Sequence, residues 1–522
     1  MSTHRNIDLI CIAAIILGLI LTVLFMNGER LGIQVIRDAD AEDYDGTEWF
    51  TANDLNGAWD DSAATVITLK GETAKVSGGG AYAWDGDVVI TGGGRYTISG
   101  ALTDGSIRVD AENSSKVWIR LNGVNVSCTD DACLRVDQAD KVFLTLAGGT
   151  ENSFTSGAEY SQEALADKTG GVIFAHDDLT INGSGSLSIT AAYKHGIDAN
   201  DALVIAGGTI TISAPGDAVH VNDSFRFTGA SLTVEAGDDA VHCDREICIE
   251  SGSILLKSCY EGLEAHTIDI AGGDITIYPS DDGLNANGGS GGFGFGGFRP
   301  GRTEQTKNDD AGEEEISVRI SGGTITIINE SARDADGIDS NGSVFIDGGF
   351  IRISLPGSGS NNAIDYGSER GGVCVVTGGD LIACGGSMMT EAFSASSTQC
   401  AVLYNPGSTA AAGTRFRVLD AEGRELLSFA PICSYSSVAF SCGALAVGET
   451  YTVCIGDSAA ELTLEGTASE FGSGGGFGFG GFGGFGGKND RGGFGGERPQ
   501  GGAGSRGDAS AGTPKAVSGR PG

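Results

Sequence analysis

The chain has 522 residues, of which 87 are glycine and only 9 are proline, and 40% of them are hydrophobic. This composition supplies a large core together with many tight turns. The 32 basic and 69 acidic residues give a net charge of −37, which argues against binding to nucleic acid or to an anionic membrane surface and suits a surface protein that captures cations.

Residues 1–30 are expected to form an N-terminal signal anchor. Leu9 to Met26 is apolar or small apart from Thr22, and about 18 such residues can span a bilayer. The sequence LFMNGERLG that ends this segment lacks the small-x-small pattern of a cleavage site. We therefore expect a single-pass protein of the cell membrane with its bulk outside the cell, the alternative being a cleaved signal peptide and secretion. Residues 31–49 follow as an acidic spacer.

Residues 50–385 are predicted to form a parallel β-helix whose first turns are irregular. Short strand-and-turn segments such as VITLKG and DVVITGGGRYTISG begin it, as expected of a capped end of a repeat protein. Tyr82 and Trp84 are expected to pack under this cap, with stacking on a sugar ring as the alternative. A loop or short helix at 156–170 precedes the regular part.

From Lys194 to Asn287 the sequence repeats itself about every 21 to 22 residues. The copies begin KHGIDANDALVIAGGTITIS, GDAVHVNDSFRFTGASLTVE, DDAVHCDREICIESGSILLK and YEGLEAHTIDIAGGDITIY, and SDDGLNAN opens a fifth. Each copy contains three short strands with apolar residues at alternate positions, which is the period of a strand with one buried face. Because three strands fill the period, no helix fits between them, and successive turns must lie side by side as a parallel β-helix.

Columns of equivalent residues predict the interior of this helix. Large apolar columns are Ile197, Val219, Val241, Leu263 and Leu284; Leu203, Phe225, Ile247 and Ile268; and Ile210, Leu232, Ile254 and Ile275. A corner column contains only the smallest residues, Gly196, Ala218, Ala240, Gly262 and Gly283. Cys243 and Cys374 fall in apolar columns, whereas Cys128 and Cys133, and likewise Cys433, Cys442 and Cys454, are close enough in sequence to pair, with the bonds left open.

The residue before this corner forms an acidic column. Stacked turns lie roughly 4.8 Å apart, so neighbouring carboxylates repel each other by about 1 to 4 kcal/mol. A bound cation relieves this repulsion, and hard oxygen ligands at a bend that contains glycine suit Ca²⁺. The alternative is a solvated acidic edge. The predicted calcium ligands are Asp217, Asp238, Asp239, Glu261, Asp281, Asp282, Asp336, Asp339 and Asp365.

The remaining segments are assigned by composition. Residues 288–314 are a glycine- and phenylalanine-rich insertion, and since the apolar columns resume in register at Val318 and Ile320, it is a loop that leaves one turn of the helix. Residues 386–466 are expected to form a small antiparallel β domain, either sandwich-like or a cap. Residues 467–522 are expected to be a disordered glycine-rich tail.

The turns GDDAVH, SDDGLNAN and DADGIDSNG, the GGTITI strands, the glycine–phenylalanine insertion and the glycine-rich tail together resemble the clostridial cell-surface carbohydrate-binding domain family. The resemblance runs from about Phe50 to Glu465. It implies a right-handed parallel β-helix similar to that of pectate lyases, calcium bound along the helix, and binding of cellulose or of acidic plant polysaccharides such as polygalacturonate.

The family's acidic corner motif falls on Asp238-Asp239 and Asp281-Asp282, with Asp336 in a variant of it. Gly216-Asp217 and Tyr260-Glu261 depart from the motif, so those turns are expected to bind metal weakly or not at all. The sugar-contacting residues of the family do not form a compact motif and are not carried over.

We expect polysaccharide binding without catalysis. A polygalacturonase needs a Gly-His-Gly and an Arg-x-Lys after its acidic residues, and neither follows here. A lyase of pectate-lyase type needs an arginine or lysine base, for which Arg245 and Arg333 are candidates. His220 and His242, which share an outward column, are either metal ligands, an acid–base pair or solvent-facing partners of carboxylates. A structural or adhesive surface protein that binds no sugar is the remaining alternative.

Overall fold

The predicted repeat forms three columns of stacked strands in the computed structural model of the protein, which describes residues 49–287, 315–330 and 335–472. All of these residues belong to one compact unit. The expected anchor at 1–30, nearly all of the spacer, the insertion at 288–314 and the chain after 472 lie outside the described residues. Within the described ranges, no helix has both the length and the apolar character needed to cross a membrane.

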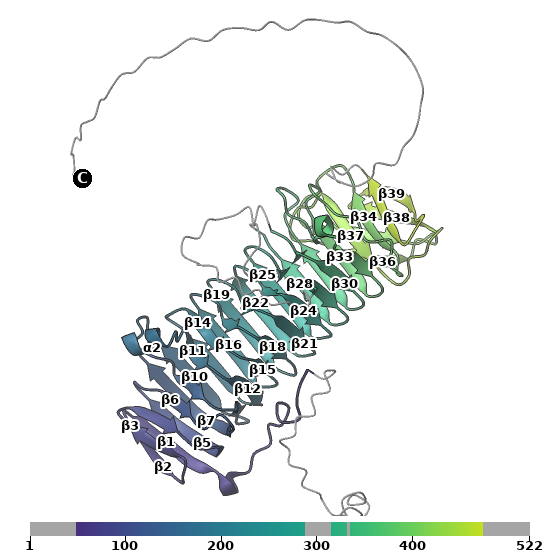
Figure 1. Ribbon diagram of the computed structural model, residues 1–522. Helices are drawn as coiled ribbons and strands as arrows, with labels where there is room; N and C mark the ends of the chain where they lie inside the picture. The colour runs from purple at the N-terminus through teal and green to yellow at the C-terminus, as the bar shows by residue number, and fades with distance from the viewer. Residues whose placement is uncertain (1–48, 288–314, 331–334, 473–522) are drawn as a thin grey trace, which may run out of the picture. The chain divides into compact units, whose positions relative to one another are not determined.

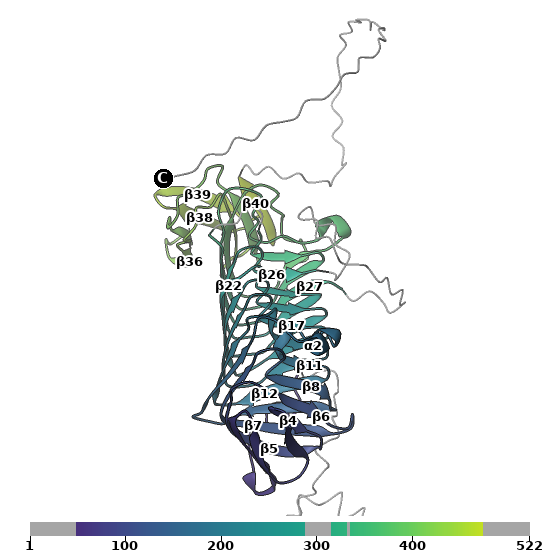
Figure 2. The ribbon, with the colours of Figure 1, turned by 90° about the vertical axis from the view of Figure 1, so that its left-hand side faces the viewer.

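The first column is an 11-stranded sheet. In spatial order it contains β3 (Ala81–Trp84), β4 (Asp87–Ile90), β6 (Ile107–Asp110), β8 (Leu134–Gln138), β11 (Gly171–Ala175), β14 (His195–Ala199), β17 (Val219–Val221), β20 (Val241–Cys243), β23 (Leu263–Ala265), β26 (Leu284–Ala286) and β29 (Ile338–Ser340). Apart from the antiparallel β3–β4 hairpin, the strands pair in parallel. Figure 2 shows β6, β8, β11, β17 and β26 stacked one above another.

The second and third columns belong to one 25-stranded sheet. The second contains β9 (Lys141–Leu146), β12 (Asp178–Gly183), β15 (Leu203–Ile205), β18 (Ser224–Phe227), β21 (Glu246–Ile249), β24 (Thr267–Ile270), β27 (Ser317–Ile320), β30 (Ser343–Ile346) and β32 (Cys374–Val376). The third contains β10 (Glu151–Ser156), β13 (Ser186–Thr190), β16 (Thr209–Ala214), β19 (Ser231–Ala236), β22 (Ser253–Cys259), β25 (Asp274–Pro279), β28 (Thr324–Ile328), β31 (Phe350–Ser354) and β33 (Asp380–Gly385). Each turn from β8 to β31 therefore contributes one strand to each column (Figure 1), and the last turn contributes β32, β33 and an isolated bridge at Ile364.

The two columns merge at the N-terminal end of the helix. The long strand β7 (Lys116–Cys128) pairs with β9 through its first half and with β10 through its second half. Before it come β5 (Gly94–Leu102), β1 (Thr65–Gly71) and β2 (Ala74–Ser77), of which only β2 runs antiparallel. The one α-helix among the described residues, α2 (Gln162–Ala166), falls within the interruption expected at 156–170.

The apolar columns predicted from the repeat form the core, which confirms the parallel β-helix. Ile197, Leu203 and Ile210 are fully buried, as are their equivalents in the following turns. The corner column is small because space is lacking there. A Cβ atom on Gly283 would lie 2.6 Å from the carbonyl oxygen of Gly337 and 2.6 Å from Cγ2 of Ile327.

The strands on either side of residues 288–314 remain in register. Ile268 of β24 pairs with Val318 of β27, and Ile270 pairs with Ile320. The segment between β26 and β27 therefore interrupts neither sheet.

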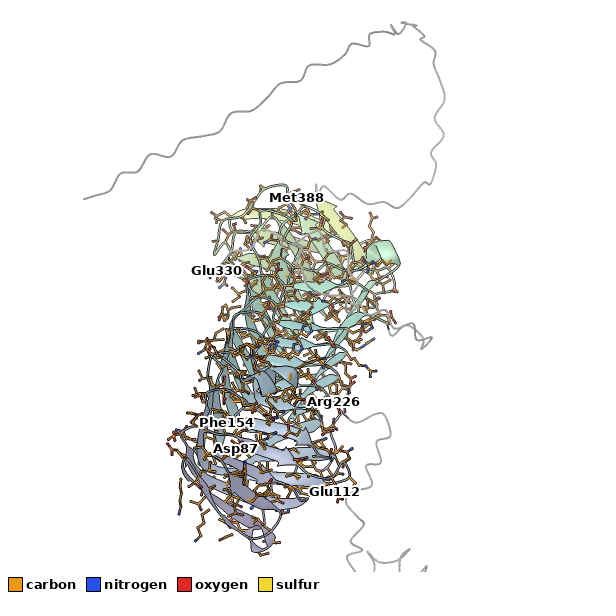
Figure 3. All side chains as sticks on the ribbon, turned by 60° about the vertical axis from the view of Figure 1, so that its left-hand side comes forward. Asp87, Glu112, Phe154, Arg226, Glu330 and Met388 are labelled. Atoms are coloured by element: carbon orange, nitrogen blue, oxygen red, sulfur yellow. The ribbon has the colours of Figure 1, made fainter. Side chains whose placement is uncertain are left out.

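The C-terminal region forms the expected small antiparallel β structure, and it packs on the last turn of the helix. Strand β37 (Ser437–Ser441) pairs antiparallel with β33 of the last turn and with β34 (Ala401–Asn405). A separate antiparallel sheet contains β36 (Glu425–Phe429), β35 (Phe416–Leu419), β38 (Thr450–Ile455) and β39 (Ser458–Thr463). Both enclose a second apolar cluster. Met388, which is labelled in Figure 3, lies at this end of the helix.

The predicted start of the tail at residue 467 lies too early. Strand β40 (Ala468–Gly472) pairs in parallel with β34, and Phe471 packs against the second cluster. Backbone pairing and one aromatic contact thus hold residues 468–472 on the C-terminal sheet.

The two aromatic residues of β3 are exposed, contrary to the expectation that they pack under the N-terminal cap. Trp84 is 70% exposed and Tyr82 is 48% exposed, so these residues do not pack under a cap. They lie on the edge strand β3, where their side chains point outward and the alternating alanines point inward.

The 11 cysteines of the described residues are all buried, and none of them forms a disulfide.

Residues 49–63 cross the outer surface of the second column. Nζ of Lys141 lies 3.0 Å from Oδ1 of Asp54, and both side chains are buried. The hydroxyl of Thr180 also donates to Asp54. Further along, Nη1 of Arg226, a residue labelled in Figure 3, donates to the carbonyl oxygen of Trp49 at 3.2 Å. These contacts fix the start of the described chain on the β-helix.

Candidate cation-binding face

Two adjacent files of polar residues follow the 11-stranded sheet. The corner file contains His195, Asp217, Asp239, Glu261, Asp282, Asp336 and Asn362. The strand file contains Asp198, His220, His242, Glu264, Asn285, Asp339 and Asp365, in the register of the strand pairs. Since each member of the strand file alternates with inward apolar residues, its side chain lies on the outer face of the sheet.

Hydrogen bonds link successive members of the corner file. Oδ1 of Asp217 accepts the backbone N–H of Asp239 at 3.1 Å, and Oδ1 of Asp239 accepts that of Glu261 at 3.1 Å. Further along, Oδ1 of Asp282 accepts the N–H of Asp336 at 2.6 Å. One carboxylate oxygen of each of these three aspartates thus holds the next turn, and only the second oxygen remains for other partners.

The series is interrupted at Glu261. Its side chain is one methylene longer than that of aspartate, and Oε2 accepts a hydrogen bond from Nδ2 of Asn285 at 2.7 Å instead. Burial and the neighbouring carboxylate of Glu264 raise the pKa of Glu261 to about 9. The interruption divides the face into a part with histidines and a part with oxygen donors only.

The part with histidines contains three stacked imidazoles. The ring centroids of His195 and His220 are 4.7 Å apart, and those of His220 and His242 are 4.9 Å apart. Nδ1 of His220 lies 2.9 Å from Oδ2 of Asp217, and Nδ1 of His195 lies 3.2 Å from the same oxygen. Burial opposes ionisation of Asp217, but these two imidazoles outweigh it and hold the pKa of Asp217 well below its usual range.

His242 interacts with carboxylates of both files. Its Nδ1 forms a short hydrogen bond with Glu264 and lies 3.6 Å from Oδ2 of Asp239. Burial disfavours the imidazolium, but its hydrogen bonds to carboxylates prevail and raise the pKa of His242 to about 12. Burial opposes ionisation of Glu264 as well, but its hydrogen bond with His242 lowers the pKa of Glu264 to about 2. These hydrogen bonds therefore favour the imidazolium form of His242.

In the part with oxygen donors only, no described histidine, lysine or arginine forms such an ion pair with Asp336, Asp339 or Asp365. One carboxylate oxygen each from Asp336, Asp339 and Asp365 lies within 4.8 Å of the other two. Burial first, and then the neighbouring carboxylates, raise the pKa of Asp339 to about 7 and that of Asp282 to about 8. The pKa of Asp336 is raised for the same reasons. A protonated group or a bound metal ion is needed to stabilise this arrangement at neutral pH.

Two buried amide oxygens beside these carboxylates accept no hydrogen bond among the described residues. They are Oδ1 of Asn285, which precedes Asp339 in the strand file, and Oδ1 of Asn362, which follows Asp336 in the corner file. Buried carbonyl oxygens are nearly always paired. Carboxylate and amide oxygens together are the donor set that a hard divalent cation such as Ca²⁺ prefers.

The structure groups some of the predicted calcium ligands and separates others. Asp217, Asp238 and Asp239 form one cluster, and Asp336, Asp339 and Asp365 form another. Among the described residues, Glu261, Asp281 and Asp282 belong to no such three-residue cluster. Asp281 instead accepts a hydrogen bond from Tyr260, whereas Asp282 and Glu261 lie in the corner file between the two clusters.

Sequence reasoning did not include Asn285, Asn362 or Glu391 among the predicted calcium ligands, although Asn362 stands out in the NNAIDYG turn that carries Asp365. Glu391 lies in the C-terminal region, yet Oε2 accepts the N–H of Tyr366, next to Asp365, at 3.2 Å. Burial raises the pKa of Glu391 to about 7. Its position has no counterpart in the repeat, so no column identifies it. Asn285 and Asn362 do occupy columns, but a search for charged residues passes over them.

A groove lies on a different face, over the third column. Its volume is about 490 Å³, and residues of β7, β10, β13 and β16 line it. The lining includes the hydroxyl or amide side chains of Asn125, Asn152, Ser153, Ser186, Ser188, Thr209 and Thr211, with Glu151 as its only charged residue.

Comparisons with known proteins complete the description. The model of a family described as carbohydrate-binding domain-containing protein matches residues 84–380, more than half of the chain. A carbohydrate-binding domain-containing protein of Acetivibrio thermocellus is 38% identical over 129 residues, which amount to 24% of this chain and 45% of that relative, so the match spans less than half of its length. A solved structure, a polysaccharide lyase-like protein from C. thermocellum in a gadolinium derivative, is similar with a TM-score of 0.35 and 24% identity over 60% of this chain and 97% of that chain.

Proposed function

The chain belongs to the family of carbohydrate-binding domain-containing proteins, and we propose that it is a non-catalytic extracellular protein that binds polysaccharide with the help of calcium held on the acidic face of the β-helix. Residues 9–26, which lie outside the described residues, would anchor it in the cell membrane. The polysaccharides it would bind are acidic pectin-type chains and cellulose.

The observation that carries the proposal is the oxygen cluster of Asp336, Asp339 and Asp365. With Oδ1 of Asn285 and of Asn362 beside it, the cluster offers up to five of the six to eight oxygen ligands that Ca²⁺ takes. A calcium ion held there retains coordination positions for outside oxygens. Uronate carboxylates are suitable ligands, and the cation would overcome the repulsion between them and a chain of net charge −37.

The groove over the third column supports binding of a neutral polysaccharide. The exposed side chains of Asn125, Ser188, Thr209 and Thr211 can exchange hydrogen bonds with sugar hydroxyls, and a single carboxylate, that of Glu151, is among the lining residues. A cellulose-type chain needs no cation to bind such a surface. The two ligand classes are therefore assigned to different faces.

The lyase alternative lacks a base near the carboxylates in the part of the chain that the structure describes. The guanidinium of Arg245 pairs with Asp223 at 3.1 Å, and no described lysine or arginine forms an ion pair with Asp336, Asp339 or Asp365. Arg333, the other candidate, lies outside the described residues. The family description likewise favours binding over catalysis.

Affinity electrophoresis tests the proposal. Migration of the full chain should be retarded by polygalacturonate with calcium and not with a chelator, whereas retardation by a soluble cellulose derivative should survive the chelator. Asp339→Asn should weaken only the first effect, and Asp274→Asn, which changes an exposed carboxylate of β25, should alter neither. Retardation by no polysaccharide would favour the purely structural role. Unsaturated products that absorb ultraviolet light would show that the protein is a lyase.

A further inference from the structure

The part of the face with histidines contains nitrogen donors, which a calcium site does not require. Nδ1 of His195 and Nδ1 of His220 come from successive turns and approach the same carboxylate oxygen, Oδ2 of Asp217, at 3.2 Å and 2.9 Å. The rings are stacked with an interplanar angle of 19°, and their Nδ1 edges face the same side because both approach this one oxygen. One ligand atom of each of the three residues lies within 4.8 Å of the other two.

The two distances from an Nδ1 atom to Oδ2 of Asp217 are close to the ligand–ligand distances of a zinc site. With Zn–N and Zn–O bonds of about 2.0 to 2.2 Å, two ligand atoms of a tetrahedral site are about 3.4 Å apart. The observed distances of 3.2 Å for His195 and 2.9 Å for His220 therefore require each Nδ1 atom to move away from Oδ2 of Asp217 by only a few tenths of an ångström. Coordination at His195 would also replace the hydrogen bond that its Nδ1 accepts from the backbone N–H of Asp217 at 3.2 Å.

The surroundings leave room for further ligands. The side chain of His220 is 28% exposed and that of His195 is 16% exposed, whereas Asp217 is buried. A carboxylate oxygen of Asp238 also lies within 4.8 Å of one of Asp217. A fourth ligand is thus either this carboxylate or water, as in zinc sites that keep an open position.

We propose that His195, Asp217 and His220 form a binding site for a divalent transition metal of the zinc type, separate from the oxygen cluster of Asp336, Asp339 and Asp365. Imidazole suits zinc and its neighbours in the first transition series, whereas carboxylate and amide oxygens suit calcium. One continuous face therefore carries two sites that select different metals. This site does not depend on calcium or polysaccharide binding at the other cluster.

Isothermal titration calorimetry on the full, chelator-treated chain tests the site with Zn²⁺ alone and with Zn²⁺ in the presence of a tenfold excess of Ca²⁺. We expect one equivalent of Zn²⁺ to bind with an affinity that calcium leaves unchanged. His220→Phe keeps a ring in the stack and removes the nitrogen, and it should weaken zinc binding at least tenfold. His266→Phe, outside both files, should not. Asp339→Asn should weaken calcium binding and leave zinc binding intact.

Substitution with Co²⁺ provides a second measurement. A visible d–d absorption band should appear in the wild-type chain and be lost in His220→Phe. If that variant does not fold, as judged by far-ultraviolet circular dichroism, His195→Gln replaces it with the same expectations. The proposal is wrong if the wild-type chain binds no Zn²⁺, if calcium displaces it at equal concentration, or if folded variants at both histidines bind it as tightly as the wild type.

Discussion

The backbone N–H of Asp239 donates to Oδ1 of Asp217, one turn earlier in the β-helix, at 3.1 Å. Asp217 and Asp239 are both buried, so Oδ1 of Asp217 is needed to pair the buried N–H of Asp239 and thereby contributes to stability. An unpaired buried donor costs about 1 to 3 kcal/mol.

The stability of Asp217→Ala should therefore fall by about 1 to 3 kcal/mol in urea unfolding with a chelator present. Asp217→Asn keeps an oxygen acceptor and should retain most of the stability of the wild type. Equal losses in the two variants would show that the charge of Asp217, and not its hydrogen bond, stabilises the corner.

Stability without metal should decrease as pH rises from about 5 to 9. Asp282 and Asp339 have folded-state pKa values of about 8 and about 7, above the unfolded value of about 3.9. Between the unfolded and the folded pKa, the native chain binds more protons than the unfolded chain. The two carboxyls therefore stabilise the folded state fully at low pH, and this stabilisation is lost as pH rises through their folded pKa values. Thermal melts in a chelator at pH 5.5 and 8.5 measure this. A higher melting temperature at pH 8.5 would contradict the raised pKa values.

Calcium should raise the melting temperature at pH 8. A ligand at 100 times its dissociation constant stabilises the folded state by about 2.7 kcal/mol. Asp365→Asn should reduce this gain, whereas Asp274→Asn should not. A melting temperature that calcium does not change, in a chain that is otherwise folded, would mean that Asp336, Asp339 and Asp365 are merely protonated or solvated.

Gly283→Ala should destabilise the helix by about 1 to 3 kcal/mol, the usual effect of overpacking. The added Cβ would meet a backbone oxygen and Ile327. Gly79→Ala is the matched control, because nothing lies within 4 Å of the Cβ position at Gly79. Denaturation midpoints of the two variants should differ clearly, and similar midpoints would show that the corner relaxes at little cost.

Lys141→Met should destabilise the protein by about 3 to 5 kcal/mol, because it leaves the buried carboxylate of Asp54 without its ion pair. The exposed pair of Lys257 and Glu235 is the comparison, and Lys257→Met should cost less than about 1 kcal/mol. Proteolysis should also cut the segment before residue 63 faster in Lys141→Met. Equal stability of the two variants would mean that the segment holds its place without this pair.

The sequence was sufficient for the β-helix because one period imposes both the strands and their register. Ile197, Val219 and Val241 recur at fixed spacing, and a register shift of one residue would turn every apolar column outward. The C-terminal region has no period. Its pairing of β37 with β33, and of β40 with β34, depends on contacts between distant segments that no local pattern encodes.

The candidate site was predictable only in part for a similar reason. Columns place Asp217 and His220 in adjacent files, but the convergence of His195 and His220 on one oxygen of Asp217 depends on the rotamers of the two histidines. Neither the diversion of Glu261 to Asn285 nor the approach of Glu391 to residue 366 follows from spacing. Side-chain length and distant packing decide these contacts.

The undisturbed pairing of Ile268 with Val318 across residues 288–314 makes this turn a natural attachment point. The sheet hydrogen bonds of β26 and β27 fix the position of this turn along the helix axis, independently of the sequence inserted between the two strands. A fluorescent reporter or a second binding module spliced between β26 and β27 would thus be carried one turn from Asp339. The scaffold could in this way report occupancy of its own acidic face.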